Sequence, residues 1–256
     1  MSFFDKVFAS VGIGSATVDT KLEKATYFTG ENVRGVVEIK GGKTEQKVDE
    51  IYLSLNTTYI KESDDKKYTV STAIERFRLT EAFTIRSGEK KEIPFSFQLP
   101  DDTPISLGRT KIWVQTGLDI KNAVDPGDKD FINVIPNNLM SAVFSAVDNL
   151  GFRMREADCQ EASYKLRGRL PFVQEFEFIP VAGSFRGKLD EIEIVFRPLS
   201  NQSTEVLLQI DRRARGLGGF LSEAMEMDET NVRFTVSNPD VNAIQQQLLS
   251  VLNKYS

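Results

Sequence analysis

Apolar and polar residues alternate along most of the chain with a period of two, the pattern of β-strands that bury one face. The clearest runs span residues 33–39, 51–57, 93–99, 112–120 and 192–196. Turn residues such as Gly41-Gly42 and Ser87-Gly88 separate these runs. Short strands that recur every ~8–12 residues favour β-sandwiches over a parallel α/β sheet.

Residues 136–151 depart from this pattern and have apolar residues at helical spacing. The residues on the predicted apolar face are Leu139, Met140, Val143, Phe144, Val147 and Leu150. Asn137 or Asn138 can serve as the N-cap, and Gly151 can end the helix. We therefore predict a helix between two β-rich halves.

Two further helices are predicted at the ends of the chain. The first spans residues 1–12, with one apolar face formed by Phe3, Phe4, Val7, Phe8 and Val11. A helix this short is barely stable alone in water, so it must dock on something: its own β-domain, a partner's groove or a membrane surface. Membrane contact is the least favoured, because the helix lacks a cationic face. The last helix follows Pro239, and we expect it to pack on the second domain or, alternatively, on a partner or a second copy.

The predicted organisation is therefore two β domains joined by a helix. A β-sandwich over residues 1–135 includes the helix at 1–12, residues 136–151 connect, and a second β-sandwich over 152–256 ends in a helix. The second half contains QEFEFIP, which resembles IPFSFQLP in the first half and suggests two related sandwiches in series.

Composition excludes several kinds of chemistry. The chain has no His, which removes His-based acid–base catalysis and His-containing metal motifs. Its one Cys, Cys159, cannot form an internal disulfide and fits a reducing compartment. The net charge of −5 is mixed along the chain without a basic stripe, so we expect no nucleic-acid partner. No apolar run approaches the ~20 residues of a membrane span.

Two groups of carboxylates are candidate sites. Asp125, Asp128 and Asp130 surround a Pro-Gly turn, but no Glu follows at the spacing of a calcium loop, so we expect a solvated turn. Glu175 and Glu177 share one face of a predicted strand, where we expect a solvated pair rather than a catalytic one. We predict no catalytic, cofactor-binding or metal-binding residues.

Four stretches carry a family resemblance: YFTGENVRGVVEIKGG, GRTKIWVQTGLDIKNAVDPGD, LRGRLPFVQEFEFIP and IDRRARGLGGF. Together they resemble the sporulation-control proteins of bacilli known as stage-zero protein M. The first stretch is also similar to the first sandwich of arrestin-like proteins, a group built from two tandem β-sandwiches. The resemblance implies a mainly β fold and a cytoplasmic, non-enzymatic regulator that acts early in sporulation.

The leading functional prediction is a scaffold that binds proteins through strand edges, loops or its terminal helix, with a homodimer as one way of covering an edge. The alternative is an extracellular or surface Ig-like binding module. Arrestin-like folds keep charged residues near the domain junction, where an unpaired charge is costly. The candidates for such contacts are Asp119 and Asp125 with Arg212, Arg213 and Arg215, although a solvated turn also explains the arginines.

Overall fold

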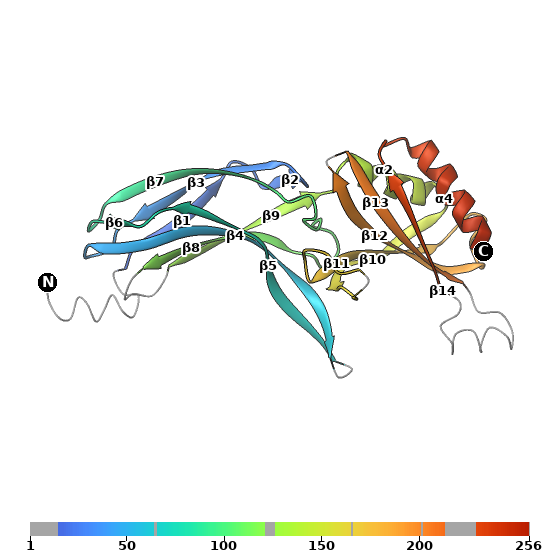
Figure 1. The fold of residues 1–256 in the computed structure, drawn as a ribbon, viewed down its shortest axis with the longest axis horizontal. Helices are drawn as coiled ribbons and strands as arrows, with labels where there is room; N and C mark the ends of the chain where they lie inside the picture. Colours follow the sequence, from blue (N-terminus) through green and yellow to red (C-terminus); the bar gives the residue numbers. More distant parts are fainter. Residues whose placement is uncertain are drawn as a thin grey trace. The chain divides into compact units, whose positions relative to one another are not determined.

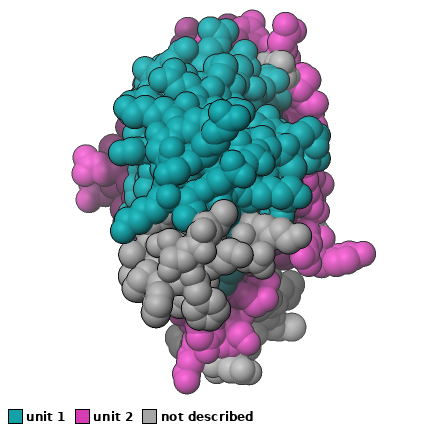
Figure 2. Space-filling model, turned by 90° about the vertical axis from the view of Figure 1, so that its left-hand side faces the viewer, with its two compact units in different colours: residues 1–58, 70–106, 111–134 teal, residues 59–69, 107–110, 135–256 magenta. Residues whose placement is uncertain are grey.

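The computed structural model describes residues 15–63, 66–120, 126–164, 166–200, 202–212 and 229–255 (Figure 1). The chain divides into two compact units, coloured separately in Figure 2. Unit 1 comprises residues 1–58, 70–106 and 111–134, and unit 2 comprises residues 59–69, 107–110 and 135–256. The predicted helix at residues 1–12 lies outside the described residues.

Unit 1 contains two sheets. The smaller one has the order β1 (Thr17–Leu22), β3 (Asn32–Lys40) and β7 (Lys90–Gln98). The larger one contains β4 (Gln46–Ser63), β8 (Ile112–Ile120), β9 (Gly127–Ile135) and β2 (Thr26–Phe28), and both β5 (Lys66–Thr80) and β6 (Phe83–Ile85) pair with β4. The strands β4 and β5 continue into unit 2 at residues 59–69.

The core of unit 1 follows the predicted alternation. Residues with 0% exposure include Val33, Val37, Ile51, Leu53, Leu55, Val114 and Leu118. Two contacts join the sheets: the rings of Phe77 and Phe97 stack with centroids 4.2 Å apart, and the hydroxyls of Thr20 and Thr116 lie 2.6 Å apart. The apolar faces of both sheets therefore meet as in a β-sandwich, as the alternation predicts.

Unit 2 is built on one antiparallel sheet covered by helices. The sheet has the order β14 (Glu229–Val236), β13 (Ser203–Arg212), β12 (Leu189–Ser200), β11 (Phe172–Pro180) and β10 (Phe152–Glu161). Phe144 of α2 (Asn138–Asn149) lies 5.1, 5.9 and 5.4 Å, between ring centroids, from Phe176, Phe178 and Phe196. Among the described residues, α2 and α4 (Val241–Tyr255) form the layer on this face.

The ends of the predicted middle helix are confirmed. The side chain of Asn137 accepts a hydrogen bond from the Met140 backbone N–H at 3.0 Å, which satisfies one of the unpaired amides at the helix start. Gly151 follows the helix with φ +89°, a left-handed conformation that favours glycine. The C-terminal helix buries Ile244, Leu248 and Leu252, so the prediction that it packs within the second domain is also confirmed.

The division into units differs from the predicted domain bounds in two places. Unit 2 includes two segments that lie before residue 135. One is the hairpin end, residues 59–69, where β4 leads into β5, and the other is residues 107–110. Strand β4 has 18 residues and β5 has 15, well beyond the usual length of about 5–6. Beyond Thr58, β4 pairs through Ile60 with Gln160 of β10 in parallel. The helix predicted as a connector, α2, is part of the core of unit 2.

Candidate functional site

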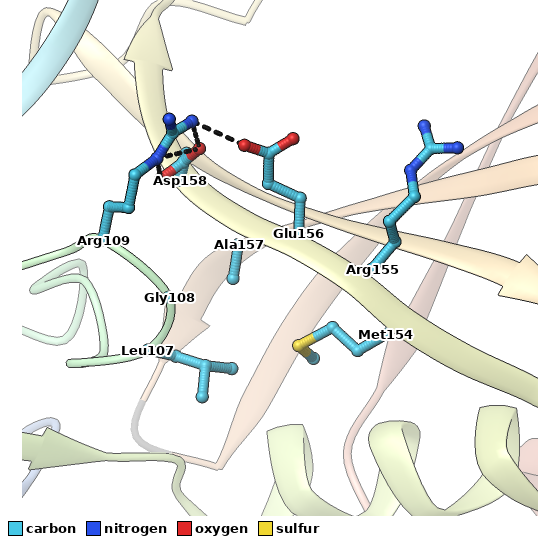
Figure 3. Close-up of a pocket in the computed structure, with 8 residues that line it drawn as sticks. All are labelled: Leu107, Gly108, Arg109, Met154, Arg155, Glu156, Ala157 and Asp158. Atoms are coloured by element: carbon cyan, nitrogen blue, oxygen red, sulfur yellow. Dashed lines mark hydrogen bonds and ion pairs between the residues drawn. The ribbon is translucent and has the colours of Figure 1, made fainter.

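Unit 2 contains an open pocket of about 410 Å³ between the segment 107–110 and strand β10 (Figure 3). Its lining consists of Leu107, Gly108, Arg109, Met154, Arg155, Glu156, Ala157 and Asp158. Gly108 has φ +61°, and a Cβ at this position would lie 2.2 Å from the carbonyl oxygen of Ala157. Glycine therefore allows the segment to lie directly against β10.

The pocket has two chemically different sides. The side chains of Leu107, Met154 and Ala157 lie together on one side of β10, whereas the charged groups point to the other side (Figure 3). A register shift between Met154 and Glu156 interrupts the alternation of the strand, so the neighbours Arg155 and Glu156 both lie on the charged side. A ligand in this pocket would meet an apolar surface with a charged rim.

Arg109 and Asp158 form the main ion pair of the rim. The Arg109 Nε donates to Asp158 Oδ1 at 3.0 Å and Oδ2 at 3.1 Å, and the Nη2 donates to Glu156 Oε1 at 2.5 Å. Asp158 is only 4% exposed. Burial by itself would raise the pKa of Asp158. The hydrogen bonds with Arg109 and Glu156 lower it by more than burial raises it, so this pKa lies below its usual value. In turn, Asp158 raises the pKa of Arg109. The pair anchors the segment 107–110 to β10.

Arg155 forms a second group of ion pairs on the same strand. The pairing of β10 with β11 shifts register between Met154 and Glu156, so Arg155 lies in a β-bulge. Its guanidinium binds Glu177 of β11 and Glu191 of β12, the latter at 2.5 Å. Two arginines thus bind four carboxylates, which come from three adjacent strands.

These groups are suited to ion pairing and hydrogen bonding. Within the described part of the chain, no group of three or more His, Cys, Asp or Glu side chains could hold a metal ion. Cys159 is buried, and its Sγ lies 3.7 Å from the hydroxyl oxygen of Thr110. No helix in the described ranges is long and apolar enough to cross a membrane.

The predicted site residues do not meet in this pocket. Asp119 is exposed on β8, where its backbone lies opposite Glu50 of β4. Arg212 ends β13 and is paired through its backbone with Leu189. The other predicted residues lie outside the described ranges: Asp125, Arg213, Arg215, Phe3, Phe4, Val7, Phe8 and Val11. The expected interdomain contacts and the docking helix therefore stay predictions.

The expectation of solvated carboxylates is wrong at Asp128, Asp130, Glu175 and Glu177, the last of which is bound by Arg155 and has a side chain only 16% exposed. Asp128 and Asp130 lie in strand β9, and Asp128 Oδ2 accepts a hydrogen bond from the Thr20 backbone N–H at 2.7 Å. Burial raises the pKa of Asp130 to about 6, with further contributions from nearby Asp128 and Asp19. Glu175 is half-buried, and its burial raises the pKa to about 7, with a further contribution from Glu193. In each case the fold partly buries a carboxylate that the sequence pattern predicts to be solvated.

The sequence pattern does not predict the arginines and carboxylates of the pocket as a site. The available signal is the high charge of RMREADCQE at residues 153–161, where charged residues outnumber the apolar ones. Arg109 gives no such signal, because its partner lies 49 residues away in the sequence.

The fold and this site define a mainly β protein of two tandem units, with an arginine–carboxylate array beside a helix-covered sheet. A family model described as SpoOM protein matches residues 4–214, and the chain belongs to this family. The sporulation-control protein Spo0M of Bacillus subtilis (strain 168) is 46% identical over 259 residues, covering 100% of both chains. The crystal structure of Spo0M from Bacillus subtilis has 44% identity and a TM-score of 0.85, and the match covers 95% of this chain and 100% of that chain. These comparisons confirm the predicted family and fold class.

Proposed function

We propose that this protein regulates sporulation as a cytoplasmic, non-enzymatic scaffold that binds other proteins. The observation that carries the proposal is the full-length match to a relative named as a sporulation-control protein. The match extends over both units and is accompanied by the same fold, so both units of this chain have counterparts in that relative.

Two features support binding rather than chemistry as the mode of action. The charged groups described above are engaged with one another across β10, β11 and β12, an arrangement that rigidifies a surface. The described sheets also end in strands such as β14 and β7, and such edge strands can accept an added strand from a partner. The apolar face predicted for residues 1–12 is a second candidate docking element.

Complementation tests the role in sporulation. The full chain, expressed in a Bacillus subtilis strain that lacks its own Spo0M, should restore wild-type counts of heat-resistant spores. A chain that is expressed stably but leaves the counts at the level of the deletion strain contradicts the proposed role.

Crosslinking in starving cells tests the scaffold mode. The double variant Phe4→Asp and Phe8→Asp alters the predicted apolar face, and Asp5→Ala with Lys6→Ala is the matched control on the polar face. Loss of defined protein partners only in the first variant supports docking through residues 1–12. If both variants keep these partners, binding is assigned to the sheets. If the full chain captures no protein, the result contradicts the proposed scaffold function.

A further inference from the structure

The face of the unit 2 sheet opposite the helices carries carboxylates in direct cross-strand pairs. Because residues paired in an antiparallel sheet point to the same face, each pair places two carboxyl groups side by side. The acid–acid pairs are Asp158 with Glu175, Glu156 with Glu177, Glu177 with Glu193, and Glu191 with Asp211. Like charges directly opposite each other destabilise a sheet, so this face needs compensation.

Two arginines compensate four of these carboxyls, and Glu175 is not among the four. Arg109 binds Asp158 and Glu156, whereas Arg155 binds Glu177 and Glu191. In the part of the chain that the structure describes, no hydrogen bond or ion pair reaches the carboxyl of Glu175.

Burial and the carboxylate of Glu193 oppose the ionisation of Glu175, which lies among several other acidic residues. Asp158 faces it directly from β10, and Glu193 faces it diagonally from β12. Glu177 is its neighbour on the same face of β11, and Glu156 lies diagonally on β10. The nearby cations are engaged with other carboxyls: Arg109 binds Asp158, Arg155 binds Glu177 and Glu191, and Arg197 of β12 binds Glu205 at 3.4 Å.

We propose that Glu175 is the proton-binding element of a switch in unit 2. When its carboxyl is neutral, the strands β10, β11 and β12 pair tightly. When it ionises, an unpaired negative charge lies between Asp158 and Glu193 and weakens the pairing. Because Asp158 also lines the pocket beside Arg109, proton binding at Glu175 is coupled to the shape of that pocket.

The pH range of the switch follows from the pKa. Burial raises the pKa of Glu175 from 4.5 to about 7, and Glu193 adds to the effect. A folded-state pKa above the unfolded value means that the folded state binds more protons, so stability falls as the pH rises. With these pKa values for the unfolded and folded states, the equilibrium constant for local opening of the β10–β11 region increases about tenfold between about pH 6 and about pH 8.

Hydrogen exchange of the full chain, corrected for the intrinsic pH dependence of exchange, measures this opening constant. The wild type should show the tenfold increase in β10 and β11, whereas Glu175→Gln should show a flat response. Glu62→Gln is the matched control, since Glu62 is exposed near the hairpin end and its substitution removes the same charge. The control should keep the wild-type response. An equal pH response in Glu175→Gln, or a flat one in the wild type, overturns the proposal.

A second measurement does not depend on the folding of any variant. Carbon-13 NMR of glutamate-labelled wild-type protein should show one side-chain carboxyl that titrates near pH 7, and its signal should be absent in Glu175→Gln. If every glutamate carboxyl of the wild type titrates near the usual 4.5, the proposal is refuted.

Discussion

Removal of the Arg109 cation should destabilise unit 2, because the buried Asp158 would lose its counter-charge. Arg109→Met keeps an apolar stem of similar length but abolishes the hydrogen bonds of 3.0 and 3.1 Å to Asp158. Breaking a buried ion pair costs about 3–5 kcal/mol. The Arg109 side chain is 67% exposed, so water can partly replace it and the expected loss is well below that of a fully buried pair.

The pH dependence of this loss has a definite sign. In the wild type, the pKa of Asp158 is held below its usual value, so the pair stabilises the fold above the unfolded pKa and is lost at acid pH. Without Arg109, burial remains and raises the pKa of Asp158, which favours the protonated form. The deficit of Arg109→Met relative to the wild type should therefore be largest near neutral pH and shrink as the pH falls.

The assay must report on unit 2 itself. Trp113, the single Trp of the chain, lies in unit 1, so its fluorescence follows the other unit. Hydrogen exchange of β10 peptides in the full chain gives the local free energy of opening. Arg153→Met is the control, since it removes the same charge from an exposed position of β10 and should leave this free energy almost unchanged. An equal deficit at acid and neutral pH, or a deficit no larger than that of the control, refutes the reasoning.

Three further predictions concern the packing and electrostatics of both units. Phe144→Ala should destabilise unit 2 by about 3 kcal/mol, because it removes the ring that contacts three phenylalanines of the sheet. Thermal unfolding should show no comparable loss of stability for Ser145→Ala, a change at an exposed position. Asn137→Ala should cost about 1 kcal/mol through loss of the helix cap, measured as faster hydrogen exchange in the first turn of α2, and unchanged exchange there contradicts the capping role. The pKa of Asp130 is raised to about 6, so its ionisation opposes folding as the pH rises. Asp130→Asn should therefore stabilise unit 1 at about pH 8 but not at about pH 4. Unfolding followed by Trp113 fluorescence measures this, and equal effects at the two pH values would exclude the explanation.

The sequence by itself determined the secondary structure and much of the core. The period-two alternation predicted the strands around Val37, Leu53 and Val114, and the helical spacing after Asn137 predicted α2 with both of its ends. These features are local: a side chain's position on a strand or helix face depends on its neighbours within a few residues. The family and the mainly β fold could therefore be predicted from the order of the residues alone.

Only the tertiary structure decided which distant segments meet. It assigned the hairpin end at residues 59–69 to unit 2, brought Arg109 onto Asp158 across 49 residues, and placed Glu175 opposite Asp158 in register. Alternation marks the face on which a residue lies but not the strand that will pair beside it. The charge state of Glu175 is set by that neighbour and by the water it excludes, and for this reason a carboxylate that the sequence pattern predicts to be solvated is half-buried in the fold.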